Sequence, residues 1–107
     1  HHPVAEDIRR ILWINLREIR KRLKAKGIEL YVYQQAYEFL AREGYNEEYG
    51  ARELRRAVDR LVTTPVSEKL VDGTFKQGDI IAVRMEEGRL TFTHGDPAHC
   101  KPVRAAS

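Results

Sequence analysis

The apolar residues between Ala5 and about Lys26 recur at spacings of three and four, which predicts an amphipathic helix. The stripe consists of Ile8, Leu12, Leu16, Ile19 and Leu23. Ile11, Trp13 and Ile14 widen it, so we expect this helix to have a second apolar contact. Gly27 is expected to end the helix, behind a cluster of basic side chains that suits its negative end.

The next two segments predict a short strand and a second helix. Residues 28–32 alternate and are rich in β-formers, whereas residues 34–43 return to helical spacing and are closed by Gly44. Tyr33 stands where a Ser, Thr or Asp would cap this helix, which costs about 1 kcal/mol relative to a good cap.

A second long helix is predicted from Arg52 to about Val71. Pro65 falls inside it, and a proline removes a backbone donor and clashes one turn back. We therefore expect a kink, or a break with a fresh start at Thr64 and Pro65. Asp72 and Gly73 are expected to end this helix.

The last third of the chain predicts a hairpin and a tail. Strands are expected at residues 80–84 and 89–93, joined by a turn at residues 86–88. Residues 95–107 lack any period, and we expect a disordered tail. The order of elements predicts an α+β fold in which three helices cover one face of a three-stranded sheet.

Composition is consistent with one small globular domain. The chain has 107 residues, of which 42% are hydrophobic and 33% charged, too apolar for a disordered chain. No apolar run approaches the roughly 20 residues needed to cross a bilayer, and we see no signal peptide. The single cysteine does not indicate an oxidising compartment, and the net charge of +3 is mild. The histidine pair at the start suggests that residues 1–4 are a tag remnant on an excised fragment.

No catalytic constellation stands out. The sequence has no G-x-x-x-x-G-K-[ST] loop to hold a triphosphate, so we expect no enzymatic activity from this segment alone. The acidic side chains at predicted turns and helix faces are interpreted as solvated charges: Glu47, Glu48, Asp59 and Glu68. His94, His99 and Cys100 lie close in sequence, but structural zinc normally takes four ligands, and we expect no metal site.

Basic side chains are numerous on the polar sides of the two long helices. Such faces can bind a nucleic-acid backbone through its phosphates. Acidic residues are interleaved with them, however, and no aromatic stacking platform accompanies the charges. This pattern favours a solvated or protein-facing surface over a nucleic-acid interface.

Arg52 differs from the other arginines in its position. It follows Gly50 and Ala51, small residues that allow close approach to the backbone, at the junction of a turn and a helix. A guanidinium there is placed to meet a phosphate or a carboxylate. From the residues alone, a simple pairing with Glu48 remains an equal alternative.

Several spaced motifs resemble the C-terminal small subdomain of the second AAA+ module of Clp-type unfoldases. The central one is the run G-Y-N-E-E-Y-G-A-R-E-L-R-R over residues 44–56, and the similarity extends from about Ile8 to Phe92. It also includes T-P-V-S-E at residues 64–68 and G-x-F-x-x-G-D at residues 73–79. On this basis residues 5–94 are identified as that subdomain.

The resemblance implies a lid for ATP bound to a neighbouring large subdomain. Arg52 would act as the second sensor of the nucleotide phosphates, with Ala51 and Gly50 beside it, and Mg²⁺ would be held by the large subdomain. The parent would be a homo-hexameric unfoldase of the cytoplasm, or of an organelle stroma or matrix. Within it, this small subdomain would contact the large subdomains of the same and adjacent subunits. It would either rescue aggregates or feed a partner protease, and the sequence does not say which.

This chain departs from the family pattern at Tyr33-Gln34, at Asn46-Glu47 and at Glu53, where the family usually has Thr or Ser-Asp, Asp-Pro and Pro. These positions concern caps and turns, although Glu53 is able to compete for the Arg52 guanidinium. Two other hypotheses remain: a free-standing basic module for nucleic acid or an acidic protein, and a purely structural oligomerisation domain.

Overall fold

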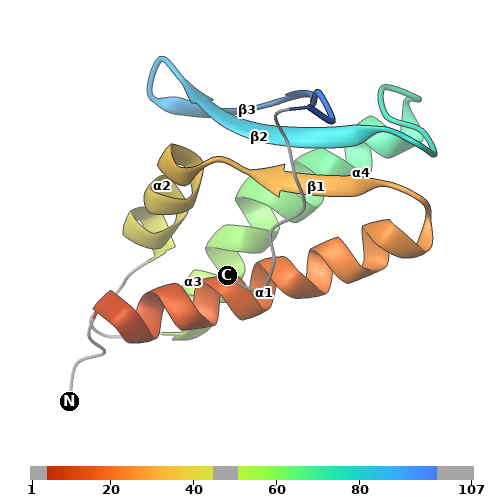
Figure 1. Ribbon diagram of the computed structural model, residues 1–107. Helices are drawn as coiled ribbons and strands as arrows, with labels where there is room; N and C mark the ends of the chain where they lie inside the picture. The colour runs from red at the N-terminus through yellow and green to blue at the C-terminus, as the bar shows by residue number, and fades with distance from the viewer. Residues whose placement is uncertain (1–4, 45–50, 99–107) are drawn as a thin grey trace.

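The computed structural model describes residues 5–44 and 51–98 of the chain. The helices lie together against one face of a three-stranded sheet, and the other face of the sheet carries no helix among the described residues (Figure 1). This arrangement confirms the predicted α+β class. The predicted tag remnant and most of the predicted tail lie outside the described residues.

Helix α1 spans Ala5–Ala25 and buries the predicted stripe of five apolar side chains in the core. It ends in a hydrogen-bonded cap: Ile28 N donates to Leu23 O over 3.0 Å, and Gly27 N donates to Lys24 O over 2.9 Å. Gly27 has φ +78°, a conformation that glycine adopts without a steric penalty. Ile28 therefore belongs to the cap, and strand β1 covers Glu29–Val32, one residue shorter than the alternation predicted.

Helix α2 spans Gln34–Gly44 and packs against helix α3, Ala51–Val58. The close approach requires a glycine, because a Cβ at Gly44 would lie 2.2 Å from Leu54 Cδ1 and 3.0 Å from Leu54 Cα. Glycine is thus needed at the end of α2 for steric reasons.

The predicted second long helix is a composite of α3, a π-helical segment η1 at Asp59–Thr63, and α4 at Thr64–Val71. Thr64 N donates to Asp59 O, five residues back, and Pro65 occupies the first turn of α4. The sequence predicted a kink, or a break with a fresh start at Thr64 and Pro65. The helical conformation instead continues through this junction, since Thr63 and Thr64 both have right-handed helical dihedrals. The π-helical segment was not predicted, although it lies just upstream of the proline, which lacks the N–H of a regular helical turn.

Strands β2 (Ile80–Glu86) and β3 (Arg89–His94) form an antiparallel hairpin, and β1 joins the free side of β2 in parallel. The strand order is β1-β2-β3, so both β1 and β3 are edges. Ile81 and Val83 of β2 project into the core between the sheet and the helices. The helices are thereby fixed on one side, where α1 and α3 lie next to each other.

Candidate functional site

Arg52 lies in the first turn of α3, on the side away from the core. Leu54 and Val58 of the same helix are buried, whereas Arg52 is exposed. No ion pair or hydrogen bond of Arg52 occurs among the described residues, and Glu53 does not engage it. The positive end of a helix favours anions, so a free guanidinium there adds to an existing preference.

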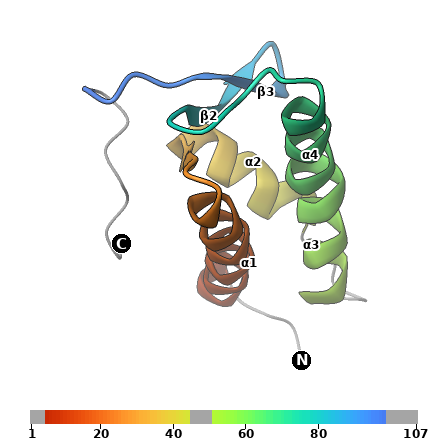
Figure 2. The same ribbon diagram turned by 90° about the vertical axis from the view of Figure 1, so that its right-hand side faces the viewer.

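Helices α1 and α3 run side by side in the same direction (Figure 2). Glu18 of α1 and Arg55 of α3 tie them together, with 3.6 Å between Glu18 Oε1 and Arg55 Nη2. One helical turn upstream of this pair stand Ile14 on α1 and Arg52 on α3. We call the surface formed by Ile14, Asn15, Glu18, Arg52 and Arg55 the α1–α3 seam.

The seam contains two features that a simple helix pair does not need. Ile14 keeps 43% of its surface exposed, one of two large hydrophobic side chains that the structure records as exposed. Asn15 is only 8% exposed, and its Nδ2 has no hydrogen-bond partner in the described part of the chain. A buried donor without a partner costs about 1–3 kcal/mol. This nitrogen is closed to solvent, so the cost falls on the stability of the fold.

Asn15 was missed in the sequence analysis. The signal was present, because a polar side chain interrupts an otherwise apolar flank between Leu12 and Ile19. Ile14 was noted only as part of a wide stripe, and its exposure confirms that the stripe exceeds what the core covers.

The remaining predicted residues are placed as follows. Ala51 begins α3, but its side chain lies outside the described residues, as do Gly50 and Glu48 with the proposed Arg52–Glu48 pairing. The structure therefore shows where Arg52 stands, and it leaves the roles of Gly50, Ala51 and Arg52 as predictions.

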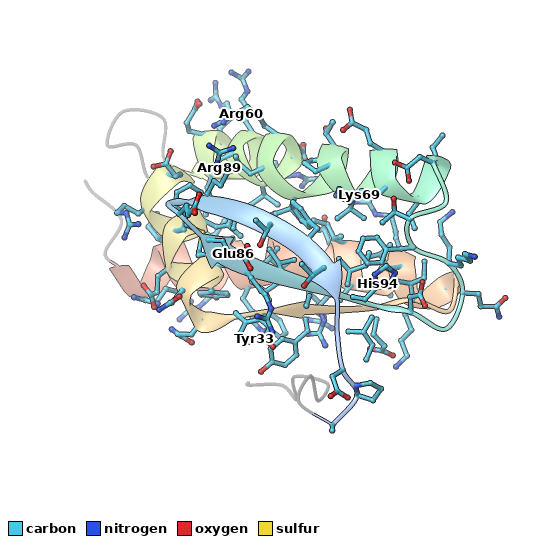
Figure 3. All side chains as sticks on the ribbon, turned by 90° about the horizontal axis from the view of Figure 1, so that it is seen from above. Tyr33, Arg60, Lys69, Glu86, Arg89 and His94 are labelled. Atoms are coloured by element: carbon cyan, nitrogen blue, oxygen red, sulfur yellow. The ribbon has the colours of Figure 1, made fainter. Side chains whose placement is uncertain are left out.

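The metal hypothesis concerns residues that only partly fall in the described ranges. His94 contacts the carbonyl of Thr74 over 2.9 Å and lies 3.6 Å from Asp79 Oδ2, at the end of β3 (Figure 3). His99 and Cys100 lie outside the described residues. Within residues 5–44 and 51–98, no three His, Cys, Asp or Glu side chains gather as metal ligands would.

Several arginines of the basic faces are already engaged with neighbours. Arg9 makes a two-pronged hydrogen bond to Glu38, whose Oε1 lies 2.6 Å from Arg9 Nη2. Arg55 pairs with Glu18, with 3.6 Å between Arg55 Nη2 and Glu18 Oε1. These contacts remove part of the positive charge that would be available to a nucleic acid.

None of the described helices has the length and apolar character to cross a membrane.

Comparison with known proteins then decides the family. A model of the C-terminal, D2-small domain of ClpB protein matches residues 4–83, from α1 through most of β2. The chain belongs to this D2-small family. The resemblance found in the sequence is thereby confirmed.

The D2-small domain is similar to chaperones of several Clp types. Over 90 residues it is 41% identical to the chloroplastic chaperone protein ClpC1 of Arabidopsis thaliana, covering 83% of this chain and 10% of that protein. Over 103 residues it is 35% identical to the chaperone protein ClpB of Rhodopseudomonas palustris, covering 96% and 12%. It is also 40% identical over 84 residues to an ATP-dependent Clp protease ATP-binding subunit ClpA homolog of Cyanidium caldarium, covering 78% and 10%. The chain thus spans about a tenth of the length of these relatives.

Proposed function

We propose that this D2-small domain is the lid subdomain of a Clp-type AAA+ ATP-dependent protein unfoldase. In this proposal Arg52 contacts the phosphates of ATP bound to the large subdomain, with Ala51 and Gly50 beside the nucleotide. The observation that carries it is the exposed Arg52 guanidinium, without an ion pair among the described residues, at the positive end of α3. Family membership supports it, since relatives are named as ATP-binding subunits.

The α1–α3 seam supplies further contacts in this proposal. Ile14 offers apolar surface to a flat base or to the apolar wall of the large subdomain. Apolar surface beside a cation is a combination that suits a nucleotide.

Arg52 would couple the nucleotide state to the angle of the lid. ATP and ADP differ by a phosphoryl group, so a cation delivered by a movable lid interacts more strongly with ATP than with ADP. A ligand shifts a conformational equilibrium only through such a difference in interaction. The lid would therefore close on ATP and relax after hydrolysis.

The partners and setting follow from the same proposal. The domain would contact large subdomains of its own and of the adjacent subunit in a homo-hexamer, and the large subdomain would supply Mg²⁺ and the catalytic groups. The parent would remodel aggregates or deliver substrates to a protease, in the cytoplasm or an organelle interior. By itself the domain would not hydrolyse ATP.

The test uses the full-length parent protein with Arg52→Ala, and Arg56→Ala as the matched control. Arg56 is exposed on the same helix one turn further on, and it too has no ion pair among the described residues. We expect Arg52→Ala to lower the rate of ATP hydrolysis roughly 100- to 1000-fold, in the range of losing one transition-state donor. Arg56→Ala is expected to leave the rate nearly unchanged.

Equal rates in wild type and Arg52→Ala, with both proteins folded, would contradict the sensor role. In that case a salt-dependent shift with single- or double-stranded nucleic acid would favour the basic binding module instead.

A further inference from the structure

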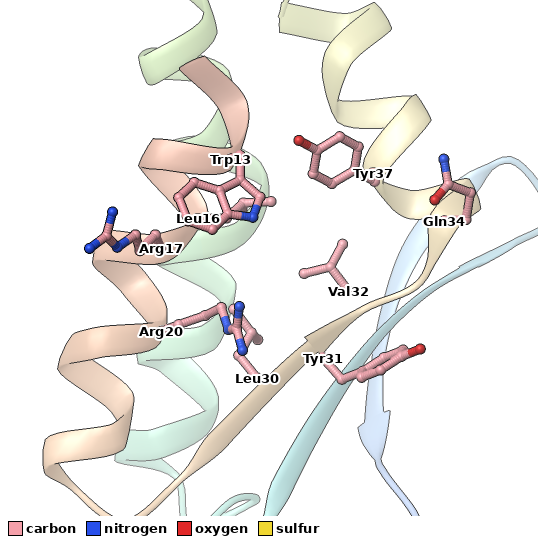
Figure 4. A pocket seen from close by; sticks show the side chains of 9 residues that line it. All are labelled: Trp13, Leu16, Arg17, Arg20, Leu30, Tyr31, Val32, Gln34 and Tyr37. Carbon is pink, nitrogen blue, oxygen red and sulfur yellow. The ribbon is translucent and has the colours of Figure 1, made fainter. Parts of the chain in front are cut away.

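A second surface lies on the opposite flank of α1, facing β1 and α2. There the structure has a cleft of about 340 Å³ between these three elements (Figure 4). We call it the β1 cleft. It is lined by Trp13, Leu16, Arg17, Arg20, Leu30, Tyr31, Val32, Gln34 and Tyr37.

The walls of the β1 cleft are apolar and aromatic. Trp13 on α1 and Tyr37 on α2 lie on its two sides, with Val32 of β1 between them (Figure 4). Tyr37 is fixed from behind, because its hydroxyl donates to the carbonyl of Arg9 over 2.7 Å. The cleft is therefore preformed on anchored side chains and has room for one large apolar side chain.

The charge beside the β1 cleft is positive, and no acidic side chain of the described residues pairs with it. Arg20 is partly buried and extends toward Leu30, and it has no ion pair among the described residues (Figure 4). Arg17 points away from the cleft and stacks on Trp13, with its Cζ 5.3 Å from the ring centroid. Glu38, the acidic residue nearest in sequence to Tyr37, is already bound by Arg9 and Gln34.

The outward hydrogen-bonding groups of strand β1 above the cleft have no partner among the described residues. Glu29 N donates to Asp79 O and Tyr33 N donates to Val83 O, so alternate residues face β2. In a parallel pair the residues between them direct their N–H and C=O to the other side. Leu30 and Val32 consequently present two donors and two acceptors along the open edge, where a further strand can pair.

We propose that the β1 edge and the β1 cleft together take up an extended segment of a partner protein. The segment would pair with Leu30 and Val32 by strand addition, a recognised way of binding peptides. Because Leu30 and Val32 are two residues apart, the two residues of the new strand that pair with them are also two residues apart. The segment would thus carry a carboxylate that meets Arg20 and, two positions away, a large apolar side chain that enters between Trp13 and Tyr37.

The proposal does not depend on the nucleotide role, since Arg52 and the α1–α3 seam lie on the other flank of α1. It also explains two features that the lid role does not use: an unpaired guanidinium and an aromatic cleft at a strand edge.

Trp13 provides the readout, because it is the only tryptophan of the chain. The probes are short synthetic peptides of alternating Thr and Val with a central Asp-Thr-Phe, in that order and reversed. Matched peptides replace Asp by Lys or Phe by Ser. One order with Asp and Phe is expected to change Trp13 fluorescence saturably and to shift the amide resonances of Leu30 and Val32.

Two variants test the proposed contact between Arg20 and the carboxylate of the peptide. Arg20→Glu is expected to weaken binding by roughly fivefold, whereas Arg22→Glu is expected to change it by less than about twofold. Arg22 is exposed on the same helix, but it stands on the flank toward α3. Equal effects of both variants would contradict a specific contact with Arg20.

Peptide N-methylation tests strand addition. In a bound strand, alternate backbone nitrogens face β1 and the others face away from it, so two sets of N-methylated peptides can be made. Only the set methylated on the side facing β1 is expected to lose binding, and equal tolerance of both sets would overturn strand addition.

Unchanged Trp13 fluorescence at millimolar peptide would overturn the proposal, as would equal binding of the Lys peptide. Concentration-dependent shifts of Leu30 without any peptide would also overturn it, by assigning the edge to a second copy of this chain.

Discussion

At the scale of single residues, Asn15 carries a cost in stability. Its side chain is buried and its Nδ2 has no partner in the described residues. Replacing such a group by an apolar one of similar size removes the cost of desolvation. We therefore predict that Asn15→Leu raises the free energy of unfolding of this chain by about 1 kcal/mol, measured by urea denaturation with Trp13 fluorescence.

In the parent protein, Asn15→Leu is expected to leave ATP binding nearly unchanged, because the Nδ2 atom is closed to solvent. A chain that is destabilised by the change would contradict this interpretation.

Glu38 gives the chain a residue whose contribution depends on pH. Hydrogen bonding by Arg9 is the largest cause that lowers the pKa of Glu38 from its ordinary value of 4.5, and partial burial opposes it. A carboxyl group with a lowered pKa in the folded state stabilises the fold fully above its unfolded pKa. This contribution is lost as the pH falls through the lowered pKa of the folded state.

We therefore predict that Glu38→Gln reduces the free energy of unfolding at neutral pH, and that the two proteins converge as the pH falls below 4.5. Urea denaturation between neutral pH and about pH 3 measures this. Glu43→Gln is the control, since Glu43 is exposed on the same helix and makes no ion pair in the described part of the chain. A difference that stays constant over the whole pH range would show that the Arg9–Glu38 pair does not stabilise the fold.

At the scale of elements, the junction between α1 and β1 depends on Gly27. Its positive φ closes the helix cap, and its carbonyl accepts a hydrogen bond from Gly78 N over 2.8 Å. A Cβ there would be strained and would also lie 2.7 Å from Gln77 Cγ. Gly73 has a similar φ of +86°, but a Cβ there meets nothing within 4 Å.

Comparing the two glycines separates strain from contact. Gly73→Ala is predicted to cost about 1 kcal/mol of unfolding free energy from backbone strain alone, and Gly27→Ala to cost more. Adding Gln77→Ala to Gly27→Ala should bring the two costs close together, as measured by thermal or urea denaturation. Equal costs for the two single variants would show that Gln77 moves away freely.

The elements that were predicted from sequence are those with strong local signals. The stripe of α1 and the glycine after it determine a helix and its end, and alternation with a tight turn determines the β2–β3 hairpin. The π-helix η1 was not predictable, because residues 59–63 carry no local pattern that distinguishes a π-helical turn from an α-helical one. Ile28 was assigned to β1 because isoleucine favours strands. Its role in the helix cap depends on the hydrogen bond from its N–H to Leu23 O, which the sequence does not show.

At the scale of the whole molecule, α1 separates two surfaces with different chemistry. The α1–α3 seam carries Arg52 and an orphan amide, and the β1 cleft carries aromatic rings and Arg20. The first could be predicted in part, since a motif around Arg52 is local in sequence. The second could not, because Trp13, Val32 and Tyr37 come together only when α1, β1 and α2 pack around the cleft.

The preference of the full-length parent for ATP over ADP tests the central claim most directly. Equilibrium affinities of both nucleotides would be measured for wild type, Arg52→Ala and Arg52→Lys. Contact between Arg52 and the terminal phosphate predicts that Arg52→Ala lowers the affinity for ATP more than that for ADP, while Arg52→Lys retains part of the preference as a point charge without the fork. An ATP-to-ADP affinity ratio that is unchanged in Arg52→Ala, in a folded and assembled protein, would contradict the claim.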